Sequence, residues 1–224
     1  MLAFIRLSLL LTHAAGSKYS ESMYAYFQQF IHVWLKFFFL FTPFFAASVF
    51  ISLTGEYTEA RRRKLAVTII IAVAALCIGL LFLGNQLFDV FGITIDAFRV
   101  GVGALLFISA INMAQGRKVS PEIDQEADIA VVPLAMPIVV GPATTGTLLV
   151  MGAGLEKAAD KMVGCLALLM AVACLGVLLF LGTAIERGIG HRGLNILSKL
   201  TGIILIALAS QMVMAGILGF VKAH

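Results

Sequence analysis

The chain has 224 residues, of which 61% are hydrophobic and only 12% are charged, and its mean hydropathy is +1.03. A soluble domain of this length could not bury so much apolar surface, so the composition identifies an integral membrane protein whose first partner is the lipid bilayer. The formal net charge of +4 gives no reason to expect a nucleic-acid partner.

The chain begins with an apolar stretch, residues 1–16, that holds Arg6 and is too short to span a membrane. A cleaved leader is one interpretation of this stretch. One positive charge makes a poor amino-terminal region for a signal peptide. We therefore expect residues 1–24 to form a loosely ordered or interfacial extension.

Six charge-poor runs follow, each close to the roughly 20 residues that a helix needs to cross the hydrocarbon core. Two charges lie at their margins: Lys36, expected to reach the interface from near the start of the first run, and Arg99 at the rim of the third. The runs are apolar on all sides, which excludes barrel strands. We predict an all-α membrane protein whose six transmembrane helices are residues 27–53, 65–83, 97–114, 129–155, 162–185 and 200–221.

Two dipeptides interrupt the first and fourth of these runs, Thr42-Pro43 and Gly141-Pro142. A small residue followed by proline is typical of a helix start, because the first-turn amide that proline lacks has no partner within the helix. Taken singly, either proline would fit a simple packing kink. The recurrence ninety-nine positions apart favours two spans that are broken at mid-membrane.

The two halves of the chain resemble each other at a nearly constant offset. A shift of ninety-nine aligns the two breaks, and a shift of one hundred aligns Arg99 with Lys199 in the third and sixth spans. Apolar helices can resemble one another by chance, but a constant offset favours a duplicated unit. Three helices are an odd number, so the second unit would be inverted. We predict repeats at residues 25–115 and 129–224, joined by a solvated polar linker at 116–128.

Basic residues set the expected orientation. Nine lysines and arginines fall in the loops after the first, third and fifth spans, and seven fall on the other side. The block at residues 61–64 flanks the first helix pair closely and decides this small bias. We therefore expect a multi-pass membrane protein with both termini outside the cytoplasm.

Nothing in the sequence indicates catalysis, a metal or a cofactor. The three cysteines, Cys77, Cys165 and Cys174, lie within predicted spans, where they serve as small packing residues. The four histidines are scattered without ligand spacing, and the spans hold neither a His-Glu-x-x-His motif nor an aspartate. We expect no enzyme activity, no catalytic residue and no metal site.

Several motifs together resemble the MarC family, also called UPF0056, of six-span bacterial inner-membrane proteins related to the lysine-exporter superfamily. They are Thr42-Pro43 through Thr54, the arginines at 61–63, the helix from Arg99 to Asn112, and Pro133-Leu134-Ala135-Met136-Pro137 leading into Gly141-Pro142-Ala143-Thr144-Thr145. The resemblance runs from about residue 25 to the carboxyl terminus. It implies a carrier of small neutral amino acids such as glycine and alanine, as reported for some members.

One departure from that family concerns the first break. The family usually has Asn or Asp before the first proline and Gly two positions after it, where this chain has Thr42 and Phe45. The first half-site has therefore lost a strong polar group and gained a ring. We expect an altered or narrower pocket.

The binding mechanism that we predict rests on helix ends. A helix that begins at mid-membrane presents unpaired amides and the positive end of its dipole, so two such ends from opposite leaflets would cradle a carboxylate. Carbonyls freed by Pro133 and Pro137 would accept from an ammonium group. The predicted substrate-binding residues are Thr42, Pro43, Phe45, Ser48, Gly141, Pro142, Ala143, Thr144 and Thr145.

Four polar residues in the third and sixth spans are candidates for lining the path of the solute: Ser109, Asn112, Ser210 and Gln211. A polar side chain in lipid is unfavourable unless it faces the bundle or a water-filled route. Hydrogen bonding between helices explains them equally well.

These features predict a transporter, exporter or facilitator, of small neutral amino acids or similar small carboxylate-bearing solutes. The alternatives are a small-solute channel and a membrane partner protein that transports nothing. A channel would concentrate its polar residues along a continuous pore, and a partner protein would not need the breaks. No motif encodes the direction of transport, ion coupling or oligomeric state.

Overall fold

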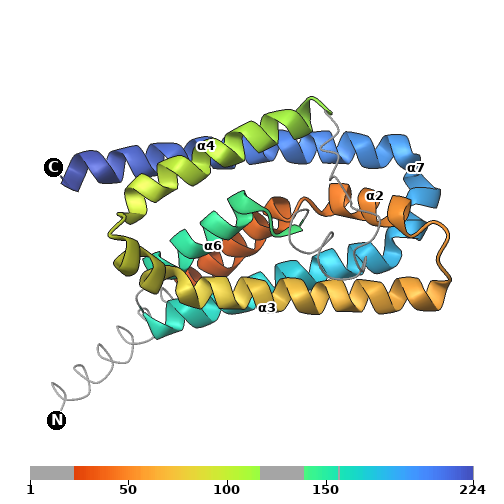
Figure 1. The fold of residues 1–224 in the computed structure, drawn as a ribbon, viewed down its shortest axis with the longest axis horizontal. Coiled ribbons are helices and arrows are strands. Elements are labelled where there is room, and N and C mark those ends of the chain that lie inside the picture. The colour runs from red at the N-terminus through yellow and green to blue at the C-terminus, as the bar shows by residue number, and fades with distance from the viewer. Residues whose placement is uncertain (1–22, 117–138, 156, 224) are drawn as a thin grey trace, which may run out of the picture.

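The computed structural model describes residues 23–116, 139–155 and 157–223, and all regular secondary structure in these ranges is helical (Figure 1). Residues 1–22 of the predicted extension (1–24), residues 117–128 of the predicted linker (116–128) and the start of the fourth span, with Pro133 and Pro137, lie outside the described residues. A helix over residues 23–40 is followed by α2 (Pro43–Leu53), α3 (Glu59–Phe91), α4 (Ile95–Ala114), α6 (Pro142–Gly154) and α7 (Ala158–Ala223).

Five stretches of the described chain are long and apolar enough to cross a membrane, and the protein is a multi-pass helical membrane protein. They are Met23–Leu53, Glu59–Phe91, Ile95–Ala114, Ala158–Gly182 and Ala184–Lys222. The fourth predicted span is represented by α6, whose 13 residues are fewer than the roughly 20 that a crossing needs.

Local capping explains where the two long helices of the first half begin. The hydroxyls of Thr58 and Thr94 accept hydrogen bonds from the amides of Arg61 and Ala97 in the first turns of α3 and α4. Helix α3 ends at Gly92, which adopts the left-handed conformation (φ 61°) that favours glycine at a helix end. The short turn that follows brings α4 back along the bundle.

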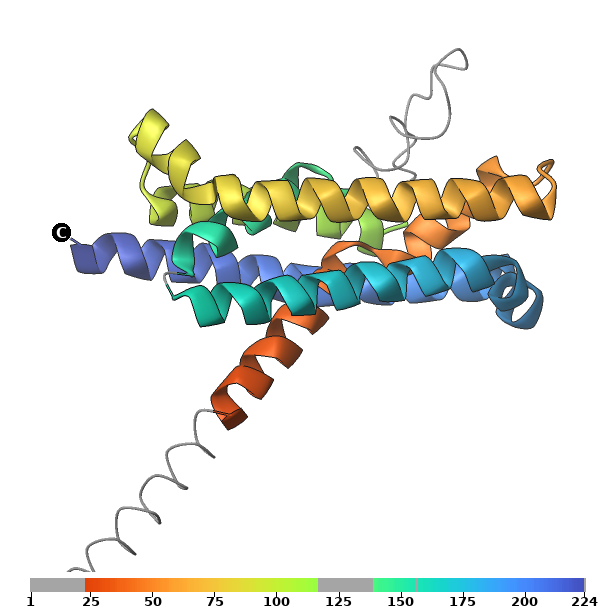
Figure 2. The ribbon, with the colours of Figure 1, turned by 90° about the horizontal axis from the view of Figure 1, so that it is seen from below.

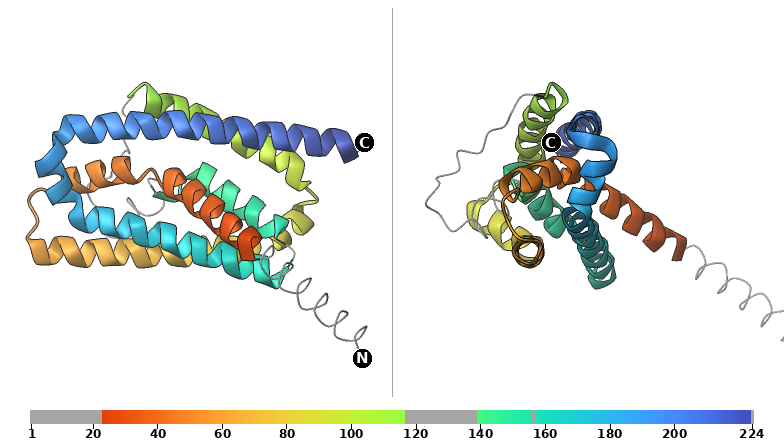
Figure 3. Two further views of the ribbon diagram at one scale, coloured as in Figure 1. Left: turned by 180° about the vertical axis from the view of Figure 1, so that it is seen from behind. Right: turned by 90° about the vertical axis from the view of Figure 1, so that its right-hand side faces the viewer.

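The helices run along one long axis, as Figure 1 shows. Helix α7 turns back on itself at Gly190 (φ 67°, ψ 170°), so its two halves are antiparallel. Helix α6 packs against α3 and α4, and α2 packs against α7. The helix at 23–40 leaves the bundle obliquely (Figures 2 and 3), and Met23 and Phe27 near its start are 71% and 64% exposed.

The structure corrects one expectation, the loop between residues 186 and 199. Apart from the turn at Gly190, this segment is helical. The sequence boundaries followed the charges, but Leu194, Ser198 and Thr201 are buried at intervals of four and three residues. That spacing places one stripe of the helix against the bundle. The chain therefore stays helical through the charged segment on both sides of Gly190.

Close backbone contact joins α3 and α6. A side chain at Gly84 would place its Cβ 2.5 Å from the carbonyl oxygen of Leu149, and one at Gly152 would meet the carbonyl oxygen of Leu81. Small residues at such positions let membrane helices approach closely. This packing holds α6 in place although it is too short to span the bilayer alone.

We expect Gly84→Ala to destabilise the protein by about 1–3 kcal/mol, because the new methyl group would collide with backbone that cannot rotate away. Gly79→Ala is the matched control, since a Cβ at Gly79 meets nothing within 4 Å on the same helix. There alanine should be neutral or stabilising, through its higher helix propensity. Thermal unfolding of the purified protein in detergent measures both. Equal melting temperatures for the two variants would contradict the close approach.

Candidate functional site

The first predicted break is present in the structure. The amide of Phe41 donates to the carbonyl of Phe37, and the amide of Thr42 to that of Phe39, both at 2.9 Å, and the helix ends there. Thr42 adopts the left-handed conformation (φ 46°, ψ 56°), the only non-glycine residue with positive φ in the described part of the chain. This conformation is strained for a β-branched residue. Pro43 then starts α2.

The second break also lies where the sequence placed it. Gly141 is extended (φ −72°, ψ 175°), and Pro142 occupies the first turn of α6. The amide of Thr145 donates to the carbonyl of Gly141 at 2.9 Å, which closes that turn. Neither Thr42 nor Gly141 supplies a side-chain cap to its helix. The first-turn amides of both helices therefore lack a capping acceptor from these residues.

Both helix starts lie in the middle of the bundle (Figure 1). Helix α2 runs toward the end where α3 begins, whereas α6 runs toward the opposite end, where α7 begins (Figure 1). Phe41 and Ala46 beside the first break belong to the same buried cluster as Val140 and Ala143 beside the second. Two positive helix ends from opposite directions thus adjoin one low-dielectric region. Such an arrangement favours an anionic group.

The predicted site residues differ in exposure. Pro43, Ala143 and Thr144 are buried, and Pro142 is exposed. The half-buried members are Thr42, Phe45, Ser48, Gly141 and Thr145.

The threonines of α6 already have partners within the protein. The hydroxyl of Thr144 donates to the carbonyl of Val139 at 3.4 Å, and that of Thr147 to the carbonyl of Ala143 at 2.8 Å. The Thr147 hydroxyl also lies 3.9 Å from the sulfur of Met212. These side chains shape the start of α6, and the backbone amides remain as the donors that a ligand would meet.

The residues predicted to line a path are not gathered at the breaks. Ser109, Ser210 and Gln211 are exposed on the surface of the chain, and Asn112 is half-buried. The hydroxyls of Ser109 and Ser210 donate to the carbonyls one turn earlier, Leu105 and Ile206, at 3.0 and 2.9 Å. Such bonds satisfy a hydroxyl within its own helix. The path stays a prediction.

Trp34 is a candidate that the sequence reasoning missed. Its indole N–H is buried and has no acceptor among the described residues, and an unsatisfied buried donor is unfavourable. Its ring lies 6.1 Å from that of Phe38, which in turn lies 6.4 Å from Phe44 in the first turn of α2. The sequence feature that could have drawn attention to Trp34 is that the chain has a single tryptophan. Tryptophans in membrane proteins usually belong to the interfacial belt, which gave no reason to place it here.

Lys36 lies well inside the first helix. Its helix begins no later than Met23, so Lys36 lies about 20 Å along it, and the side chain is half-buried. It is therefore not near the start of the helix. Arg99 pairs with Asp96 at 2.8 Å, whereas no carboxylate in the described ranges lies within ion-pair distance of Lys36.

Comparison with known proteins identifies the family. The family model described as "MarC family integral membrane protein" matches residues 27–221. A UPF0056 membrane protein of Aquifex aeolicus is 31% identical over 201 residues, which cover 86% of this chain and 94% of that protein.

Other relatives agree with this assignment. The UPF0056 membrane proteins YhcE of Escherichia coli and YvbG of Bacillus subtilis are 30% and 31% identical, over 84% of this chain and 93% and 94% of their own lengths. No solved structure matches the chain. The family match covers nearly all of the described helices and both breaks. The chain therefore belongs to the MarC family of integral membrane proteins.

Proposed function

We propose that the protein is a carrier, exporter or facilitator, for small neutral amino acids or similar small carboxylate-bearing solutes. It would act in the bacterial inner membrane with both termini outside the cytoplasm, and it would catalyse no reaction. One observation carries the proposal: two helices without side-chain caps begin within one buried cluster and run in opposite directions. Helix starts of this kind are typical of substrate sites in transporters.

The directions of the other helices support an inverted repeat of two three-helix units. Helix α3 runs opposite to the first half of α7, and α4 runs opposite to its second half (Figure 1). Each pair occupies corresponding places in the chain order. In this proposal residues 129–138 complete the fourth of six spans, and a pseudo-two-fold axis lies between the two breaks.

The donors near the breaks suit a carboxylate. The first free amides are those of Phe44 and Phe45 in α2 and of Ala143 and Thr144 in α6, since proline contributes none. In this proposal the indole N–H of Trp34 is a further donor, and the ammonium of Lys36 supplies a full positive charge on the same side of the first break. The half-buried ring of Phe45 would limit the size of the solute.

Flux into proteoliposomes tests this proposal against its alternatives. We expect saturable uptake of labelled glycine or alanine that unlabelled glycine inhibits, and no such uptake in protein-free vesicles. Uptake that rises linearly with concentration would instead indicate a channel. No flux from protein whose fold is intact by circular dichroism would indicate a partner role.

A further inference from the structure

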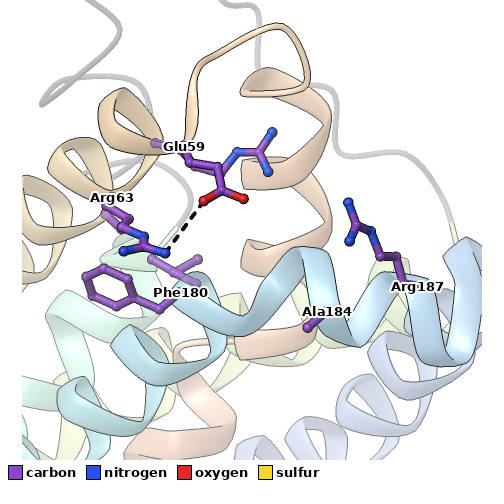
Figure 4. Close-up of a pocket in the computed structure, with 8 residues that line it drawn as sticks. Glu59, Arg63, Phe180, Ala184 and Arg187 are labelled. Atoms are coloured by element: carbon purple, nitrogen blue, oxygen red, sulfur yellow. Dashed lines mark ion pairs between the residues drawn. The ribbon is translucent and has the colours of Figure 1, made fainter.

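A second polar feature lies far along the bundle from the breaks. Where α3 begins and the first half of α7 ends, a pocket of about 180 Å³ opens between the two helices (Figure 4). Helix α3 contributes one wall, and α7 the other. Its lining residues are Glu59, Arg62, Arg63 and Ala66 from α3, and Leu179, Phe180, Ala184 and Arg187 from α7.

The charge of this pocket is positive. Three arginines and one glutamate line it, so the difference is two positive charges. The guanidinium of Arg62 donates to the carbonyl of Thr54 at 2.8 Å, which fixes its position at the pocket wall. Arg63 lies 3.6 Å from Glu59, but both side chains are mostly exposed, at 72% and 85%, so this pair is weak in water. An anion that binds Arg63 more strongly would therefore readily displace the carboxylate of Glu59.

Polarity changes along the pocket. On α3, Arg62 and Arg63 lie within the first two turns, and Ala66 lies about one turn farther along the helix. On α7, Arg187 lies two turns beyond Phe180, toward the end of the bundle. Arg187 therefore lies toward the end of the bundle, while the 45% exposed Phe180 lies beside Arg63 (Figure 4) and forms an apolar wall with Leu179.

We propose that this pocket binds the phosphate of an anionic phospholipid from the leaflet at this end of the bundle. Guanidinium groups bind phosphate oxygens through paired, charge-assisted hydrogen bonds. Basic pockets between membrane helices are the usual form of headgroup sites. A free phosphate would leave the apolar wall unused, whereas a lipid places an acyl chain along Phe180. This site is separate from the helix breaks, and its occupancy does not depend on the transported solute.

Lipid titration of the full-length protein in neutral detergent tests the proposal. We expect dioleoyl phosphatidylglycerol to raise the melting temperature and to remain bound in native mass spectrometry. Dioleoyl phosphatidylcholine, inorganic phosphate and glycerol 3-phosphate at equal concentration should do neither. Each of Arg63→Gln and Arg187→Gln should weaken phosphatidylglycerol binding about five-fold, the value of one basic residue near an anionic lipid surface.

Two further variants separate the pocket from general surface charge. Arg61→Gln removes the same charge one residue away from the lining, where Arg61 stacks 4.3 Å over the ring of Tyr57, and should leave lipid binding unchanged. Ala184→Phe fills the pocket from an exposed position without altering charge and should weaken binding. The proposal fails if Arg61→Gln weakens binding as much as Arg187→Gln, if inorganic phosphate binds as well as the lipid, or if phosphatidylcholine equals phosphatidylglycerol.

Discussion

Replacing Gly141 by leucine should weaken binding of the transported solute by at least about tenfold while the protein still folds and inserts. The backbone of Gly141 is extended, at φ −72° and ψ 175°, a conformation that any residue adopts. The substitution therefore introduces no backbone strain. Its effect comes from the side chain, which would crowd the start of α6, where a carboxylate has to reach the amides of Ala143 and Thr144. A hydrogen bond to a charged group contributes about 1.5–3 kcal/mol, so losing one accounts for a tenfold effect or more.

The matched control is Gly101→Leu. A Cβ at Gly101, on α4, meets nothing within 4 Å, so the same bulk is added away from the breaks. A thermal-shift titration with glycine and alanine compares the variants, because a ligand that binds only the folded state raises the melting temperature. If Gly141→Leu and Gly101→Leu both bind glycine and alanine as tightly as the unaltered protein does, the start of α6 is not part of the binding site.

The features that the sequence predicts well here are local. A threonine or glycine before proline determines a helix start through the immediate neighbours alone, and both breaks lie at the predicted dipeptides. Charge-poor runs locate the long helices because the bilayer excludes charge. The ends of those helices are less predictable. Helix α3 runs from Glu59 to Phe91, well beyond the predicted 65–83, because capping and interfacial contacts extend a helix past its apolar run.

The features that the sequence did not predict depend on which way a side chain faces. Ser109 and Ser210 are polar residues in apolar helices, but polarity does not reveal that their hydroxyls bond within their own helices. The sequence places Lys36 at the interface by its residue type and does not single out Trp34. The buried indole N–H of Trp34 and the half-buried side chain of Lys36 follow from how the helix at 23–40 packs, which no local pattern encodes.

The position of Lys36 leads to the second large effect that we expect. Lys36→Met should weaken binding of an amino acid about tenfold, because it removes the one lysine or arginine of the helix at 23–40, which leads into the first break, and Lys36 lacks a carboxylate partner in the described part of the chain. A charge inside a membrane segment is retained at an energetic cost, so a functional role is the default interpretation. Arg99 would not substitute, since Asp96 already neutralises it at 2.8 Å.

A comparison of two solutes isolates this charge from the rest of the site. Glycinamide keeps the ammonium group and size of glycine but has no carboxylate, so Lys36→Met should reduce glycine binding much more than any residual glycinamide binding. Lys36→Arg should retain most of the affinity for glycine, because it preserves the charge. Lys161→Met, which removes a half-buried lysine near the start of α7, should change neither. Equal losses for glycine and glycinamide would mean that Lys36 acts through packing, and the helix amides alone would then have to hold the carboxylate.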